Sequence, residues 1–192
     1  MGIRPARTCR DVERPWTRTA KRKVKKAFVR GVPDSRLRSF DMGDMKPKDA
    51  EIQIDLISNE PFQIRDNALE SARVMANKVF ENKILRDNYF FKIRLYPHQC
   101  IREHSMLTGA GADRLSSGMR KPFGRPVGRA AVTKKDQVLM TIYTLKKFEK
   151  EAKEGFKRAS QKIPGKPRVT VKDITKIDKE KLPPGRKRKN KP

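Results

Sequence analysis

Alternation of apolar and polar side chains predicts strands at four places in the chain. In residues 52–57, Ile52, Ile54 and Leu56 alternate with polar residues, which is the pattern of a strand with one buried face. Residues 89–96 alternate in the same way and end at a proline, which cannot donate to a strand ladder. The segment 137–143 predicts a third strand, and a short run at 168–172 predicts a fourth.

Two other segments carry apolar residues three and four positions apart, which predicts amphipathic helices. The clearer one covers residues 65–81, where Ala72, Ala76 and Phe80 belong to one stripe. The second covers residues 148–163 and ends before a proline–glycine pair. We interpret both stripes as faces that pack on a core.

The resulting order is strand, helix, strand, long loop, strand, helix and strand, or β-α-β-β-α-β. This order predicts an α+β fold, an α/β sandwich of a mostly antiparallel sheet with two helices on one face. Residues 98–135 have no apolar periodicity, so they are expected to form a long basic loop.

The charge of the chain is large and unevenly distributed. Lys and Arg number 48 against 22 Asp and Glu, a formal net charge of +26. Residues 39–97 hold 9 basic and 10 acidic side chains (−1), whereas 1–38 hold 13 and 3 (+10), 98–135 hold 8 and 2 (+6), and 164–192 hold 11 and 3 (+8). Neutralising phosphates releases counterions, so nucleic acid is the favoured partner. A neutral core with cationic extensions is typical of such a protein.

These blocks divide the chain into three parts. Residues 1–38 are a basic N-terminal arm, residues 39–172 an α+β core domain with the loop 98–135 inserted, and residues 173–192 a basic C-terminal tail. A membrane is the weaker partner because no apolar run approaches the roughly 20 residues that span a bilayer. The N-terminus has no apolar signal-peptide core, and a cytoplasmic location fits.

The loop 98–135 has a composition suited to ordering against RNA. Glycine lets the backbone approach another surface closely, and proline limits the entropy lost on ordering. Arginine forms paired hydrogen bonds with phosphate. Met119 and Phe123 are candidates for stacking on bases or wedging against them.

Catalytic and metal-binding interpretations compete for the same residues and are weaker. His98 and His104, taken with Glu103 or Asp113, lack the spacing of helical metal-binding motifs. Cys100 lies near His98, but a small residue closing a strand end is the better interpretation. A Gly-x-Gly pair in the loop lacks the third glycine of a dinucleotide-binding motif. We therefore expect no enzyme activity, no metal and no cofactor.

The N-terminal arm contributes spaced arginines and a dense cationic run suited to neutralising an RNA backbone. Together with cations of the loop, it gives the side chains that we predict to bind RNA: Arg4, Arg7, Arg10, Arg14, Arg18, Lys21, Arg22, Lys23, Arg30, Arg120, Lys121, Arg125 and Arg129.

Several motifs occur in an order that resembles one known family. They are RPAR at 4–7, RGVPD at 30–34, FDMG at 40–43, QIRDNALE at 63–70, KIRLYPH at 92–98, GAGADR at 109–114 and GMRKPFG at 118–124. Over about residues 1–172 the chain resembles the universal large-subunit ribosomal proteins called L-sixteen in bacteria and L-ten-e in archaea. The sequences of these motifs are more similar to those of the archaeal than of the eukaryotic members. The cationic run at 21–26 and the tail beyond 172 depart from the resemblance.

This resemblance implies a structural role in the large subunit of the cytoplasmic ribosome, near the aminoacyl-tRNA site and the peptidyl-transferase centre. The implied partners are 23S-type ribosomal RNA, tRNA and neighbouring large-subunit proteins, with 5S ribosomal RNA as a further candidate. A free RNA- or DNA-binding regulatory protein is the alternative. The family's glycine-rich loop faces tRNA, and that role would fall here on His98, Arg102, Met106, Gly109, Ala110, Gly111, Ala112, Asp113 and Arg114.

Overall fold

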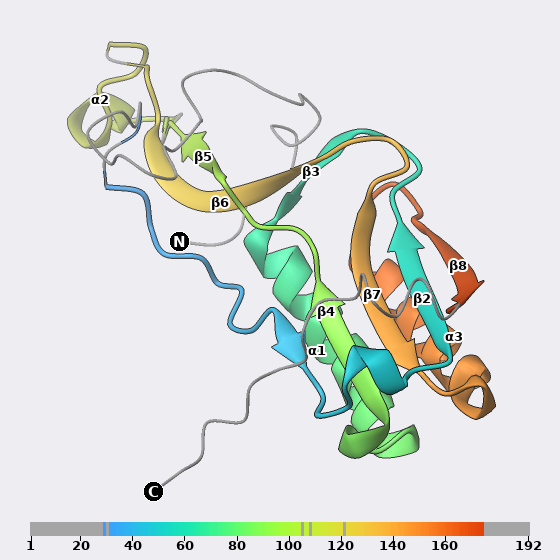
Figure 1. Ribbon diagram of the computed structural model, residues 1–192. Coiled ribbons are helices and arrows are strands. Elements are labelled where there is room, and N and C mark those ends of the chain that lie inside the picture. Colours follow the sequence, from blue (N-terminus) through green and yellow to red (C-terminus); the bar gives the residue numbers. More distant parts are fainter. Residues whose placement is uncertain (1–28, 30, 105, 108, 121, 175–192) are drawn as a thin grey trace, which may run out of the picture.

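Two antiparallel sheets and two long helices make up the part of the chain that the computed structural model describes, residues 29, 31–104, 106, 107, 109–120 and 122–174 (Figure 1). The larger sheet has the strand order β1-β4-β7-β2-β8, formed by β1 (Asp41–Met42), β4 (Tyr89–Ile93), β7 (Val138–Thr144), β2 (Ile52–Ile57) and β8 (Arg168–Asp173). The smaller sheet has the order β3-β6-β5, formed by β3 (Phe62–Arg65), β6 (Arg125–Thr133) and β5 (Gln99–Glu103).

The larger sheet forms where alternating side chains predict strands, so the four strand predictions are confirmed. The central strand β7 pairs with β2 on one side and with β4 on the other. In these ladders Ile142 lies opposite both Ile54 and Phe91. Residues directly opposite one another share a face of the sheet, so the apolar positions of three strands join into one buried surface.

Both helices cover that surface, as the apolar stripes predict. They are α1 (Asp66–Lys83) and α3 (Glu149–Ser160), and Figure 1 shows them on one side of the larger sheet. Phe80 of α1 meets Phe156 of α3 and Phe91 of β4 edge-to-face, with ring centroids 5.8 and 5.3 Å apart. A Cβ at Gly155 would lie 2.2 Å from a ring carbon of Phe80, so the missing side chain lets the helices approach closely.

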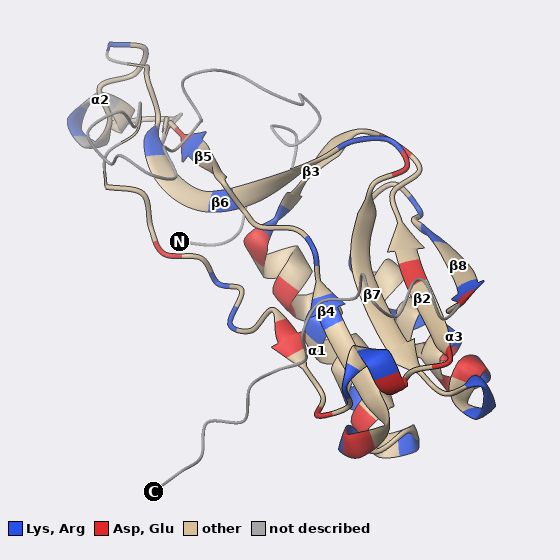
Figure 2. Cartoon of the chain, viewed as in Figure 1, with Lys and Arg blue, Asp and Glu red and all other residues tan. Residues whose placement is uncertain are grey.

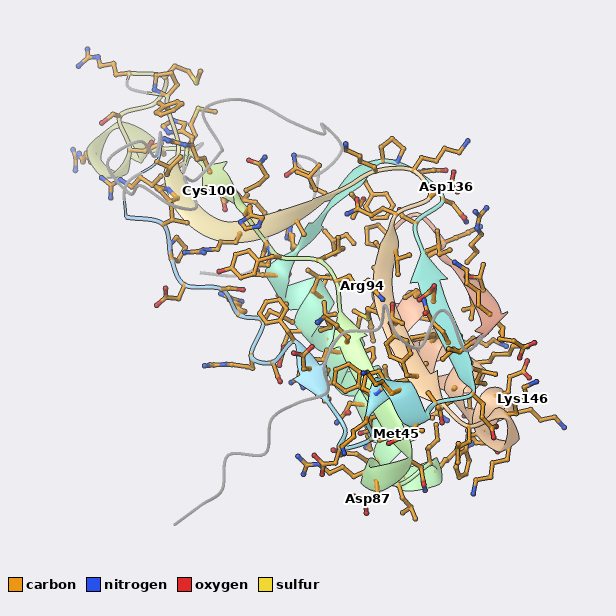
Figure 3. The ribbon with its side chains drawn as sticks, in the orientation of Figure 1. Met45, Asp87, Arg94, Cys100, Asp136 and Lys146 are labelled. Atoms are coloured by element: carbon orange, nitrogen blue, oxygen red, sulfur yellow. The ribbon has the colours of Figure 1, made fainter. Side chains whose placement is uncertain are left out.

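The opposite face of the larger sheet is polar in its centre and apolar at one end. Thr141 donates to the buried carboxylate of Asp55 at 2.8 Å, and Arg94, which is labelled in Figure 3, donates to the hydroxyls of Thr141 and Tyr143. Tyr143 also packs with Phe90 beside the short 3₁₀ helix η4 (Pro47–Asp49). The polar positions of the predicted strands therefore form a hydrogen-bonded layer.

The prediction of one sheet and a long loop at 98–135 is wrong, because β5 and β6 arise within that segment and join β3 in a second sheet. β6 contains proline, glycine and alanine, which are poor strand formers, and therefore lacks the expected composition. Pairing on both sides stabilises it: Ala130 lies opposite both Arg65 and Gln99. Backbone hydrogen bonds across two ladders replace the missing side-chain pattern.

Candidate nucleic-acid interface

The β5–β6 hairpin, residues 99–133, extends away from the two helices (Figure 1). The strand register places the backbone of Glu103 opposite that of Arg125 at its far end, and Cys100 opposite Arg129 nearer the core. The connection between the strands carries the short helix α2 (Ala112–Leu115). Among the described residues, no side chain between positions 96 and 130 belongs to either hydrophobic cluster. The far end of the hairpin is therefore held by local contacts.

Local hydrogen bonds and one close backbone approach shape the end of the hairpin. The ring nitrogen Nε2 of His104 lies 2.7 Å from the carbonyl oxygen of Gly118 and ties the two sides of the connection together. A Cβ at Gly124 would lie 2.7 Å from the backbone of Glu103, so only glycine permits this approach. Gly111 is the N-cap residue that directly precedes α2, and it has a φ of +76°, which glycine adopts without strain.

Cations without acidic partners gather on the hairpin (Figure 2). Arg114, Arg120 and Arg125 are exposed. Within the part of the chain that the structure describes, no carboxylate lies at ion-pair distance from these three guanidinium groups. An uncompensated group of like charges on a small projection creates a positive potential that attracts anions.

In the core, unlike the hairpin, many basic side chains have acidic neighbours. Glu154 contacts Lys83 of α1 at 2.5 Å and Arg158 of its own helix at 2.7 Å. The hydrogen bond from Lys83 is the main cause that lowers the pKa of this carboxyl. Arg168 and Asp136 form another pair at 2.8 Å. The field of the core is thus largely neutralised within the molecule, whereas that of the hairpin is not.

Large apolar side chains are also exposed on the hairpin. Met119 and Phe123 expose 67% and 63% of their surface, and Met106, Leu107 and Val127 expose nearly half. Exposed apolar side chains on a projecting, cationic element are candidates for contact with a partner. The arrangement combines guanidinium groups, which can neutralise phosphate, with exposed apolar side chains, which can contact bases, and RNA recognition uses both kinds of group.

The base of the hairpin is fixed to the segment that precedes the larger sheet. Arg129 donates from Nε to the carbonyl oxygen of Pro33 at 2.7 Å. The backbone amides of Arg36 and Arg38 donate to the carboxylates of Asp66 and Glu70 on α1. The side chains of both arginines are exposed.

The structure brings together the described members of the predicted set. Arg102 lies in β5, and Arg125 and Arg129 lie in β6. His98 precedes β5, and the centroid of its ring lies 4.4 Å from that of Tyr96. The remaining described positions lie in the connection at the end of the hairpin. Of Asp113 the structure describes the backbone only. Nine predicted RNA-binding residues of the arm and Lys121 lie outside the described residues: Arg4, Arg7, Arg10, Arg14, Arg18, Lys21, Arg22, Lys23 and Arg30.

Sequence reasoning missed two contacts that shape this surface. They are the hydrogen bond from Arg129 to Pro33 and a stacking contact between Arg102 and Phe123. A signal for the strand itself was present, because Arg125, Val127 and Arg129 alternate with smaller residues. The sequence therefore indicates the spacing of the arginines on one face of a strand, but it does not indicate the contacts with Pro33 and Phe123.

The hairpin does not have the features of a catalytic site. Cys100 is buried, and burial raises the pKa of its thiol, so the reactive thiolate is less populated than in a free cysteine. In the described segments no three His, Cys, Asp or Glu side chains gather as a metal site would require. A search of the same segments finds no helix with the length and apolar character needed to cross a bilayer.

Comparison with known proteins identifies the family. A family model described as "Ribosomal protein L16p/L10e" matches residues 16–170. The chain belongs to this family. Large ribosomal subunit protein uL16 of Archaeoglobus fulgidus is 42% identical to it over 182 residues, which cover 95% of this chain and 100% of the relative. The proteins of the same name in Methanococcus aeolicus and Picrophilus torridus are 40% and 46% identical, covering 89% and 80% of this chain and 95% and 87% of theirs.

Membership of the L16p/L10e family settles the broad class of function. The chain is a structural ribosomal protein and not an enzyme. The resemblance read from the motifs is confirmed, including its archaeal character, since these relatives are archaeal. The match to the family model covers both the hairpin and the core.

Proposed function

We propose that this protein is a constituent of the large subunit of the cytoplasmic ribosome. In this proposal the core is a rigid support, and the β5–β6 hairpin and the basic arm bind 23S-type ribosomal RNA, with 5S ribosomal RNA as a further candidate. The observation that carries the proposal is the group of exposed arginines on a projecting hairpin, each without an acidic partner among the described residues. Ribosomal RNA supplies the phosphates that this arrangement lacks.

The end of the hairpin is the part that we assign to tRNA positioning near the aminoacyl-tRNA site and the peptidyl-transferase centre. Residues 109–114 lie at this end and carry no core contact among the described residues. Glycine there exposes backbone amides that can approach a nucleic acid without steric hindrance. The role is positional: the hairpin supports bound RNA and performs no bond-making step.

Deletion of residues 110–114 is expected to separate these two parts of the proposal. The variant should still sediment with large subunits through a moderate-salt wash, because it loses only one of the exposed arginines, Arg114, and keeps Arg120, Arg125, the core and the paired strands. Translation by those subunits should fall several-fold, because the segment assigned to tRNA is missing. The measurement is peptide synthesis per large subunit, with sedimentation of the unaltered protein as the control.

Two outcomes would count against the proposal at different levels. Unchanged translation by subunits that contain the deletion variant would remove the tRNA-side role and leave the ribosomal assignment intact. Release of the unaltered protein from large subunits by the same wash would instead favour a free RNA-binding regulator.

A further inference from the structure

The exposed ring of Phe123 is held in place by an arginine from the neighbouring strand. The guanidinium carbon of Arg102 lies 3.9 Å from the centroid of the ring. The same guanidinium donates from Nη1 to the carbonyl oxygen of Gly124 at 3.3 Å, and so is fixed to the backbone beside the ring. Arg102 itself belongs to β5 and pairs with Pro126 of β6. The ring thus rests on a support built into the hairpin.

The arrangement leaves one face of the ring available. Arg102 lies over one face of the ring, and 63% of the surface of Phe123 is nevertheless exposed. A cation beneath an aromatic ring stabilises its orientation without adding an apolar neighbour. Exposure of this ring to water is unfavourable in the free protein, because burial of apolar surface lowers the free energy.

Charges around the ring indicate which kind of molecule covers it. Arg120 and Arg125 flank Phe123 in sequence, are exposed, and have no acidic partner among the described residues. An aromatic face beside unpaired guanidinium groups suits a nucleotide, whose base stacks while its phosphate binds the cation. Bases within a regular RNA helix are inaccessible to such a ring, so the nucleotide must be unpaired.

We propose that Phe123 is a stacking site for an unpaired base of ribosomal RNA and that Arg102 is its positioning residue. The inference rests on the proposed function, because it deepens the RNA-binding role of the hairpin. It adds a contact that depends on the base, in contrast to phosphate contacts, which depend on charge. Stacking of a base on an aromatic side chain corresponds to a gain in affinity on the order of tenfold or more.

Two labelled RNA probes of equal length distinguish stacking from charge. One is a single-stranded adenine oligonucleotide of about ten residues, and the other has the same ribose-phosphate chain without bases. The full-length protein should prefer the first probe. In Phe123→Ala this preference should fall about tenfold, and the dependence of affinity on salt should stay the same because no cation is lost.

Conservative variants and a surface control complete the test. Phe123→Trp should restore the preference because it retains an aromatic face, whereas Phe123→Leu should not, although it retains apolar area. Val74 is exposed on α1, away from the hairpin, so Val74→Ala should behave as the unaltered protein.

The role of Arg102 is tested by a double-mutant cycle. Arg102→Lys keeps the charge but loses the planar group that supports the ring, so it should lower the preference for the base-containing probe several-fold. In the Phe123→Ala background the same substitution should change the preference by less than twofold. An equal effect in both backgrounds would mean that Arg102 acts independently of the Phe123 ring and would overturn its positioning role.

The failure of the inference differs from the failure of the proposed function. If Phe123→Ala keeps the full preference while binding remains steeply dependent on salt, the stacking of a base on this ring is contradicted and the RNA-binding function stands. If the unaltered protein binds neither probe in a salt-dependent manner, the RNA-binding function itself is contradicted, and the stacking site with it.

Discussion

Replacing Arg114, Arg120 and Arg125 together with glutamine is expected to weaken binding to large-subunit ribosomal RNA on the order of a hundredfold near 0.1 M monovalent salt. Each of these guanidinium groups is exposed and lacks an acidic partner among the described residues. Each is therefore free to neutralise a phosphate and release its counterions. Three lost contacts should also reduce the slope of log affinity against log salt by about 2 to 3.

A charge-matched variant separates the hairpin from the net charge of the protein. Lys153, Arg158 and Arg168 are also half-exposed cations, but each lies within 2.8 Å of a carboxylate. Their joint replacement with glutamine removes the same formal charge and should change the affinity far less, by about threefold or less, because these groups lie on α3 and β8, outside the hairpin that we propose to bind RNA. If both triple variants weakened binding equally, net charge rather than the hairpin would explain it.

Phe80→Ala is expected to lower the free energy of unfolding by about 3–5 kcal/mol. The side chain is fully buried and its ring contacts the rings of Tyr89, Phe91 and Phe156. Truncation leaves a cavity where α1, α3 and the larger sheet meet, and the two helices cannot close it without moving apart. Urea denaturation followed by circular dichroism measures the change.

The control for this substitution lies on the same helix. Val74 is exposed, so Val74→Ala should change the free energy of unfolding by no more than about 0.5 kcal/mol. A loss below about 1 kcal/mol in Phe80→Ala would contradict the assignment of this ring to the centre of the core.

The sequence predicts the larger sheet and both helices because burial imposes a period on them. Ile54 and Ile142 alternate with polar neighbours since only one face of their strands meets the helices. The buried residues of α1, such as Ala76, and those of α3, such as Ala152, each recur at helical spacing along their own helix for the same reason. Where one face of an element is buried, its side chains report its conformation.

The second sheet cannot be predicted in this way, because few side chains in its outer part are buried. Ile101, Val127 and Gly128 sit in paired strands of the hairpin, yet none of them is buried. Their conformation follows from backbone pairing, which leaves no mark in the order of apolar residues. The arginines that we propose to bind RNA stand out in the sequence by their charge, whereas the contact of Arg102 with Phe123 depends on strand register. A bulge between Ile101 and Arg102 sets that register locally.

The central claim is that the hairpin, rather than the helical face, meets ribosomal RNA. Ultraviolet crosslinking in cells, followed by mass spectrometry of the crosslinked peptides, tests it most directly. The account predicts that, within 39–174, RNA adducts concentrate between residues 102 and 129 and are rare on the outer surface of α3. Adducts concentrated on α3, with the hairpin unmodified, would contradict it.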